Sequence, residues 1–382
     1  MIALRTAGVL LAPVTITPTK PLTLSHAKGL LWLDVMYRAT REVAPTGYEW
    51  NPRVANLTAQ TVAFWAYLDR TAPGADWSGA TERELGEAYV RSHAGGGRPA
   101  AETLRPYLDR VEAEGWTHPA SRRLIDLWLE QLRLLGVHDP GMAADRGTRC
   151  AAEDVLDRLG ARGLLVDHRR YGGPAYLDGP RWGQPLRQLV GEDGHLNYLV
   201  PILRDLLPRV GRPELTVLVH DPELTQDYVS LERVLEAFGG TVRRLPIGRV
   251  PIGGVVRSSR YGDWAGTTLG DLSRACLRHV DVPTYRLGLR IYLVAVLNRG
   301  SVRSFDPELL RRSLKRARRL IERSAARAST TDGPAAAEDL LRRLYQSQGY
   351  VDPYRLTTSL LNHSRPVPPP DLARRIYWGQ GS

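Results

Sequence analysis

The chain has 382 residues, 43% of them hydrophobic, which is enough for two or three domains with a substantial core. Its formal net charge is +11, so an anionic partner is expected. Residues 300–382 hold fifteen Arg or Lys against eight Asp or Glu, a local balance of +7. This concentration indicates either a solvated helical surface or a face that binds a phosphate backbone by releasing counterions.

Composition and spacing exclude several classes of protein. Cys150 and Cys276 lie too far apart in sequence for a zinc knuckle and give no disulfide framework. His138, His168 and His220 lack the spacing of metal ligands, so no metal site is predicted. No segment reaches the roughly 18 apolar residues of a membrane span, and the N-terminal apolar run is short for a signal peptide. We therefore expect a soluble, cytoplasmic protein with no membrane partner.

The first part of the chain has the pattern of a Rossmann-type unit. A buried strand is predicted over 9–17, a loop with Pro18 and Pro21 follows, and the apolar spacing predicts a helix over 26–40. In such a unit the N-terminus of the helix faces a bound phosphate. Helical patterns continue over 56–71, 81–92, 101–114 and 120–136.

The second part returns to strand and then becomes helical. Residues 215–220 predict a strand and 228–238 a helix, which ends at a Gly-Gly pair. Strand and loop alternate over 241–257, and the pattern is helical from about 267 to the end. We predict an α/β fold in four parts: the first half of a Rossmann-type domain (1–75), a mainly helical insertion (76–185), the second half of that domain (186–265) and a basic helical domain (266–382).

Residues 15–28 carry the first functional motif, Thr-Ile-Thr-Pro-Thr-Lys-Pro-Leu-Thr-Leu-Ser-His-Ala-Lys. The segment resembles the ATP-binding motif of class I aminoacyl-tRNA synthetases, in which an apolar residue and a glycine separate two histidines. The Lys-Pro-Leu lead-in and the basic residue after the last histidine are similar to those of arginyl-tRNA synthetases. On this alignment Thr23 replaces the first histidine, Ser25 replaces the glycine, and His26 is retained.

Further segments resemble the same family in the same order. Residues 193–198 resemble the Asp-Gly…Tyr element that leads the helix lining the amino-acid pocket, and 255–263 resemble the mobile second ATP motif. Residues 267–272 match a helix start shared by arginyl and cysteinyl enzymes, and 304–310 resemble the start of their helical anticodon-binding domain. The resemblance implies a class I synthetase catalytic domain followed by an all-α, anticodon-binding-like domain.

The ATP motifs depart from the family pattern. In the family the motif glycine lies against the adenine, so Ser25 should crowd the base. The mobile loop has Arg257 and Arg260 but no lysine, and Val256 and Ser259 replace the two lysines that normally reach the triphosphate. Lys20 occupies the place of a lysine that compensates for this loss in some arginyl enzymes. The resemblance implies a weakened ATP-site remnant made of Thr23, Ser25, His26, Arg257, Ser258, Ser259 and Arg260.

The amino-acid pocket departs as well. The family places an aspartate one helical turn after its tyrosine, where it pairs with the guanidinium of arginine, but the residue four after Tyr198 is Ile202. Leu224 aligns with a family glutamine, and Thr17 aligns with an asparagine that meets the amino-acid backbone. Because arginine would lose its charge partner, these changes favour an aliphatic group such as leucine, isoleucine or valine. The predicted aminoacyl-binding residues are Thr17, Asp193, Asn197, Tyr198, Ile202 and Leu224.

Three functions fit these features. The first transfers an aliphatic aminoacyl group from charged tRNA to a small-molecule amine, in a specialised pathway such as that of a peptidyl-nucleoside antibiotic. It needs no cofactor, because the aminoacyl ester is already activated. The second is ATP-dependent ligation of an amino acid to an amine or to tRNA, which would use ATP and Mg²⁺. The third is a non-enzymatic tRNA-binding protein. The implied partners are aminoacylated tRNA and a small-molecule amine acceptor. DNA is not expected to be a partner.

The first function assigns roles to individual residues. Lys20 and His26 would hold the terminal adenosine or stabilise the departing ribose oxygen. An amine that attacks an ester must lose a proton, and Asp221, Glu223 or His195 could accept it. The predicted tRNA-binding residues are Arg311, Arg312, Lys315, Arg316 and Arg319.

Overall fold

The computed structural model describes residues 8–13, 16–94, 99–144, 146–212, 214–256, 267–326, 333–360 and 370–378. A parallel sheet at the centre has the strand order β2-β1-β6-β7, with β1 spanning Gly8–Ala12, β2 Thr46–Tyr48, β6 Glu214–His220 and β7 Thr241–Pro246. The Rossmann-type α/β fold expected from the sequence is confirmed.

Helices cover both faces of this sheet, which explains why every residue of β1 is buried. Because side chains alternate along a strand, Val9 and Leu11 point to one face and Leu10 and Ala12 to the other. The first pair belongs to a core with helix α1 (Leu24–Arg41), and the second to a core with α8 (Leu199–Leu206) and α9 (Thr225–Ala237).

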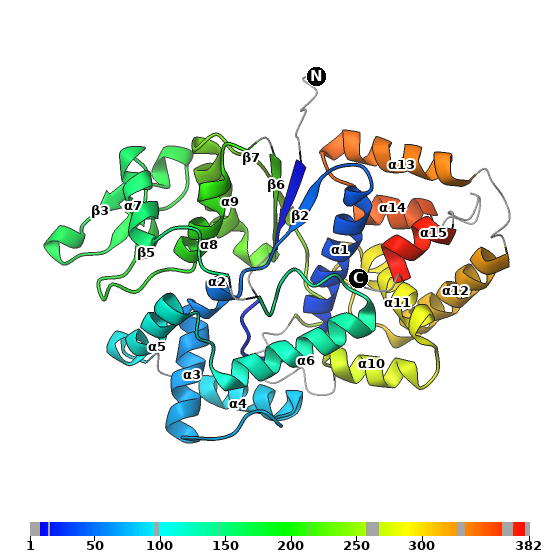
Figure 1. Cartoon of the computed structure of the whole chain (residues 1–382), viewed down its shortest axis with the longest axis horizontal. Coiled ribbons are helices and arrows are strands. Elements are labelled where there is room, and N and C mark those ends of the chain that lie inside the picture. The colour runs from blue at the N-terminus through cyan, green and yellow to red at the C-terminus, as the bar shows by residue number, and fades with distance from the viewer. Residues whose placement is uncertain are drawn as a thin grey trace.

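The segment expected to be a mainly helical insertion lies below and to the left of the sheet in Figure 1. Its helices share a core with α3, in which Phe64 and Trp65 pack with Tyr89 and Leu124. The segment also contains β3 (Leu165–Asp167) and β4 (Ala175–Leu177), which form an antiparallel sheet with β5 (Arg187–Val190) just after it, and the sequence did not indicate this sheet. Strands this short have too few residues to establish a period of two. The helices of this region are α2 (Pro52–Asn56), α3 (Ala59–Thr71), α4 (Glu82–Ala94), α5 (Ala101–Glu114), α6 (Pro119–Leu135) and α7 (Ala152–Ala161).

The C-terminal region is helical and packs against α1 rather than standing apart (Figure 1). Val35 and Ala39 of α1 share a core with Leu287, Ile291 and Leu320. No helix in the described ranges is long and apolar enough to cross a membrane. The helices are α10 (Leu269–Leu277), α11 (Val282–Arg290), the π-helical η6 (Ile291–Val296), α12 (Pro307–Ala326), α13 (Gly333–Gln348), α14 (Pro353–Leu360), α15 (Pro370–Ala373) and the π-helical η7 (Arg374–Trp378).

A buried ion pair joins these regions. Asp34 of α1 is 0% exposed, and its Oδ2 lies 2.6 Å from Nη2 of Arg290 on α11, which is equally buried. Arg38 Nε donates to the other Asp34 oxygen at 2.8 Å, and the backbone N–H of His138 donates to the same oxygen at 2.9 Å. Arg290 and Arg38 also donate to carbonyls of Leu135 and Gly136, so guanidinium groups satisfy the C-terminus of α6.

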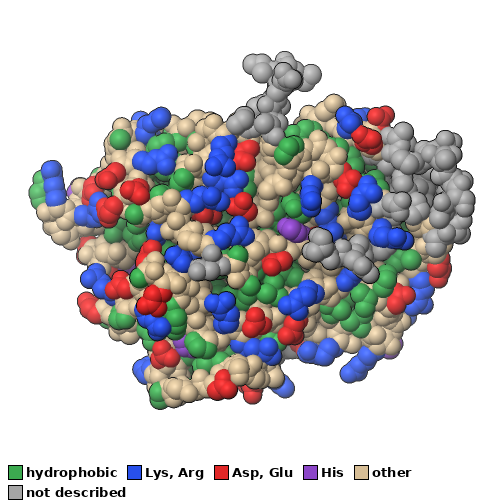
Figure 2. Space-filling view, viewed as in Figure 1, with side chains coloured by type: hydrophobic (Ala, Val, Ile, Leu, Met, Phe, Trp, Pro, Cys, Tyr) green, Lys and Arg blue, Asp and Glu red, His purple; other side chains and the backbone are tan. Residues whose placement is uncertain are grey.

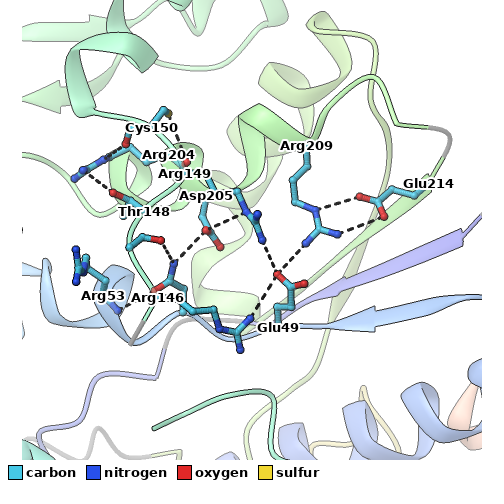
Figure 3. A network of polar contacts seen from close by, with 12 residues as sticks. Glu49, Arg53, Arg146, Thr148, Arg149, Cys150, Arg204, Asp205, Arg209 and Glu214 are labelled. Atoms are coloured by element: carbon cyan, nitrogen blue, oxygen red, sulfur yellow. Dashed lines mark hydrogen bonds and ion pairs between the residues drawn. The ribbon is translucent and has the colours of Figure 1, made fainter. Parts of the chain in front are cut away.

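A second, partly exposed network ties the chain returning from the helical segment to the sheet (Figure 3). Glu49, just after β2, lies 2.9 Å from guanidinium nitrogens of Arg149 and Arg209 and 3.7 Å from Arg146. Arg209 also pairs with Glu214 at the start of β6, at 3.2 Å. Because water reaches these groups, each pair should contribute less to stability than the Asp34 pair.

Asp34→Asn should lower the free energy of unfolding by about 3–5 kcal/mol, because it leaves the Arg290 guanidinium buried without its counter-charge. Urea denaturation would measure this. Glu308→Gln is the matched control, since it breaks a pair with Arg311 in which both side chains are more than 60% exposed. We expect this control to lower the free energy of unfolding by about 0.5 kcal/mol or less. A loss below 1 kcal/mol for Asp34→Asn would contradict the role assigned to the buried pair.

Candidate functional site

A cavity of about 680 Å³ lies between the loop after β1, the start of α3, the 191–197 turn, α8 and the start of α9. It brings together seven residues singled out from the sequence: Thr17, Asp193, His195, Asn197, Tyr198, Ile202 and Leu224. Its other lining residues, which sequence reasoning missed, are Thr58, Ala59, Gln60, Gln188, Gly191, Glu192, Leu196 and Tyr228.

The 191–197 turn presents polar groups to the cavity. Gly191 N–H donates to the His195 carbonyl, and Gly194 has a φ of 75°, a left-handed conformation that favours glycine. One Asp193 oxygen accepts from the backbone N–H of His195 at 3.0 Å, and Asn197 Oδ1 accepts from Leu199 N–H at 3.1 Å. Each side chain therefore uses one oxygen to hold the turn.

Another part of the lining is apolar. Ile202 is 8% exposed, and Leu224 packs against the same core. The ring of Tyr228 stacks on His220, with centroids 4.7 Å apart. Burial lowers the pKa of His220, so this imidazole is neutral near pH 7 and packs against Tyr228, which lines the cavity.

Tyr198 connects the cavity to a buried carboxylate that the sequence did not single out. Its hydroxyl donates to Asp227 Oδ2 at 2.5 Å, and Arg187 Nε lies 2.8 Å from Asp227 Oδ1. Burial and the neighbouring carboxylate raise the pKa of Tyr198, so the phenol stays protonated. The only signal in the sequence was an acidic residue in the first turn of a helix that follows a strand, which also occurs where no site exists.

Gln60 links the cavity to the helical segment. Its Nε2 donates to Tyr89 Oη at 2.9 Å and to Thr17 Oγ1 at 3.3 Å. The ammonium of Lys20 lies 5.3 Å from the centre of the Tyr89 ring, within cation–π range. Thr17 and Lys20, from the first motif, are thus held by α3 and α4. No motif in the sequence marked Gln60 or Tyr89.

The remnant of the first ATP motif forms the N-terminus of α1. The Thr23 backbone N–H donates to His26 Nδ1 at 3.0 Å, so Nδ1 is an acceptor and the proton of the neutral ring lies on Nε2. Burial, together with the charges of Lys20 and Arg249, lowers the pKa of His26 to about 3. Ser25 Oγ accepts from the backbone N–H of Val250 at 3.0 Å, which ties α1 to the loop after β7.

Two of the three candidate proton acceptors do not line the cavity. Asp221 and Glu223 follow β6 and both pair with Arg249, through Nε in the first case and through Nη2 at 2.7 Å in the second. Protonating either carboxylate would weaken an ion pair, whereas His195 lies in the cavity wall. Across the described ranges, no three His, Cys, Asp or Glu side chains are grouped to hold a metal ion. The second ATP motif, Arg257, Ser258, Ser259 and Arg260, lies outside the described residues.

The residues expected to bind tRNA lie on α12, which contains seven cationic and two acidic residues. Arg312, Lys315 and Arg319 are exposed at intervals of three and four residues, so they form one stripe. Arg311 is exposed but pairs with Glu308, and Arg316 is only partly exposed. Elsewhere, on the face in Figure 2, cationic and acidic side chains are interspersed.

The parallel sheet, the helix that starts after its first strand and the helical C-terminal region give this chain the fold of class I aminoacyl-tRNA synthetases. The resemblance inferred from the sequence is confirmed at this level. Arginyl-tRNA synthetase from Thermus thermophilus has a TM-score of 0.63 and 12% identity, covering 95% of this chain and 75% of that one. A putative arginyl-tRNA synthetase from Campylobacter jejuni has a TM-score of 0.50 and 13% identity, covering 97% and 84%.

The likeness extends beyond arginyl enzymes. Methionyl-tRNA synthetase from Mycobacterium tuberculosis, in complex with methionyl-adenylate, has a TM-score of 0.51 and 12% identity, covering 93% of this chain and 81% of that one. No protein-family model matches the sequence, and no curated protein matches it. At these identities the similarity establishes the fold alone.

His26 should remain neutral, with its proton on Nε2, from pH 8 down to about pH 4, because its pKa is lowered to about 3. The unfolded chain would bind this proton near pH 6.5, so folding stability due to His26 is complete above pH 6.5 and is lost as the pH falls toward 3. ¹⁵N-resolved NMR of the imidazoles, assigned with His26→Gln, would measure the titration. A midpoint near 6.5 would show that the ring is not held as described.

Proposed function

We propose that this protein is an aminoacyl-tRNA-dependent aminoacyltransferase, which moves an aliphatic aminoacyl group from charged tRNA to a small-molecule amine. The proposal depends chiefly on the cavity, where the predicted aminoacyl-binding residues converge on a synthetase-like fold. A specialised biosynthetic pathway, of the peptidyl-nucleoside antibiotic type, would use such an enzyme.

The apolar wall supports an aliphatic substrate. Ile202 and Leu224 face the cavity where an arginine-binding site would need a polar partner. Burying the four side-chain carbons of leucine there would contribute about 3 kcal/mol, at roughly 0.8 kcal/mol for each CH₂. A guanidinium beside the same two residues would lose its water without gaining a partner.

The ATP-site remnant supports transfer from an ester already formed. Ser25, which aligns with the glycine of the family motif, carries a side chain that accepts a hydrogen bond from the Val250 N–H and so ties α1 to the loop after β7. Adenylation also requires stabilisation of a developing phosphate charge, and the second motif contains no lysine. Aminolysis of an aminoacyl ester requires neither group.

In the proposed reaction the amine nitrogen forms a bond to the ester carbonyl carbon, and the bond from that carbon to the ribose oxygen breaks. His26, neutral with Nε2–H as donor, would stabilise the departing oxygen by a hydrogen bond, with Lys20 nearby, and the proton that the amine loses would end on that oxygen. Asp193, Asn197 and Tyr198 would bind the aminoacyl group. His195 is the favoured acceptor of the amine proton, because Asp221 and Glu223 are engaged by Arg249.

The alternative is an ATP-dependent ligase. It is favoured by one observation, that a lysine and a histidine remain close together at the start of α1, where Lys20 acts electrostatically on His26. A lysine at this position could partly replace those absent from the second motif. The two functions differ in whether ATP is consumed.

Amide formation should proceed from purified leucyl-, isoleucyl- or valyl-tRNA and a panel of amines after ATP has been removed, and ATP–pyrophosphate exchange should stay at background. Each lost contact to the transferring phosphate can cost roughly 3 kcal/mol, so two losses would slow adenylation by about four orders of magnitude. Mass spectrometry of the product and a radiolabel exchange assay would measure the two activities. Robust exchange, with product formed only when ATP is present, would establish the ligase instead.

The stripe on α12 should give tRNA binding a steep salt dependence. Replacing Arg312, Lys315 and Arg319 by alanine should reduce the slope of log K against log salt by about 2–3, since each phosphate contact contributes roughly 0.7–0.9. Filter binding between about 50 and 200 mM salt would measure it. The control is a triple alanine variant of Arg83, Arg91 and Arg122, exposed arginines on α4 and α6. Equal slopes for both variants and the wild type would remove α12 from the tRNA interface.

A further inference from the structure

A carboxylate lies directly behind the cavity wall. Asp227 is 8% exposed and occupies the first turn of α9, next to Tyr228, which lines the cavity. Its Oδ2 accepts the hydroxyl hydrogen of Tyr198, a second lining residue, at 2.5 Å. The negative charge is therefore one hydrogen bond away from any group that contacts Tyr198.

The counter-ion of this carboxylate comes from the chain itself. Arg187, the first residue of β5, brings Nε to 2.8 Å from Asp227 Oδ1. The Arg187 side chain is 39% exposed and that of Asp227 is 12% exposed, while the Nε that contacts the carboxylate is itself buried. Neither residue is among those lining the cavity, and the pair lies behind Tyr198.

We propose that Arg187 is a specificity-determining residue, which neutralises Asp227 and thereby prevents the cavity from accepting a cationic side chain. The inference rests on the proposed function, because it concerns which aminoacyl groups that same site rejects. The Tyr198 hydroxyl also determines which kind of ligand group can contact it. Since its hydroxyl hydrogen is directed to Asp227, the oxygen presents only lone pairs to a ligand and can accept from an N–H donor.

The size of the effect follows from burial. A carboxylate in a partly buried site attracts a cation about 5 Å away much more strongly than one in water, because the effective dielectric is lower. Glu192 and Asp193 also line the cavity, but both are exposed, and water screens their charge. Without Arg187, Asp227 would draw a ligand cation toward Tyr198, and affinity for a basic side chain should rise about tenfold or more.

The test compares two amino-acid amides, which carry the same ammonium group and, like the ester, no carboxylate. Isothermal titration calorimetry would measure L-leucinamide and L-argininamide against wild type, Arg187→Ala and Arg187→Met. The methionine variant retains most of the aliphatic stem, in case the alanine variant fails to fold. In a folded Arg187 variant we expect the affinity for argininamide to rise at least tenfold and the affinity for leucinamide to change little.

Two controls separate the mechanism from a general effect. Arg212→Ala removes an exposed arginine outside the cavity and should change neither affinity. Arg187→Ala combined with Asp227→Asn removes both charges and should cancel the gain. A folded Arg187 variant that binds argininamide no more tightly than the wild-type protein would overturn the proposal, whether or not the wild-type protein binds leucinamide. If wild type does not bind leucinamide while the Arg187 variant gains argininamide, the specificity role stands and the aliphatic substrate is wrong.

Discussion

The architecture depends on one buried contact, the ion pair between Asp34 and Arg290. Two charges withdrawn from water need further polar partners. Here Arg38 and the His138 N–H donate to Asp34, and the Leu135 carbonyl at the end of α6 accepts from Arg290, whose buried Nε alone in this group has no hydrogen-bond partner among the described residues. The contact therefore fixes three regions at once: α1 beside the sheet, the helical segment through α6, and the C-terminal region through α11. An apolar contact could supply similar stability, but it would not specify direction as this guanidinium does, with Nη2 donating to Asp34 and Nη1 to the Leu135 carbonyl.

Because α1 is held on both sides, its N-terminus has a fixed position, and with it Ser25 and His26. The loop after β7 is fixed in turn by backbone contacts to the C-terminal region, from Gly248 N–H to the Arg299 carbonyl at 2.7 Å and from Phe305 N–H to the Pro251 carbonyl at 2.7 Å. Ser25 then bridges α1 and this loop. The contact between Ser25 and Val250 is thus supported by residues far from it in sequence.

Much of the fold could be predicted from the sequence, because long helices and buried strands leave clear patterns. The helix expected over 101–114 has those bounds, and that expected over 26–40 begins two residues earlier, at Leu24. The residues that line the cavity could be predicted only where they fall in a segment that resembles a family motif, as Tyr198 and Ile202 do. Gln60 and the Asp227–Arg187 pair depend on how distant elements pack, so no local pattern could reveal them. Likewise, the pairing of Asp221 with Arg249 is a tertiary contact, and it changes which residue is the favoured base.

The substitutions in the two halves of the site have a common physical direction. In the segment that resembles the ATP motif, the Ser25 side chain is already hydrogen-bonded to the chain, and His26 is held as a neutral donor. In the amino-acid half, Ile202 stands where a charge would be needed, and Arg187 cancels the carboxylate that remains. Both halves reduce the uncompensated charge available to a ligand. That suits a neutral ester carbonyl and an aliphatic side chain, and it opposes the triphosphate and guanidinium for which an arginyl site must provide counter-charges.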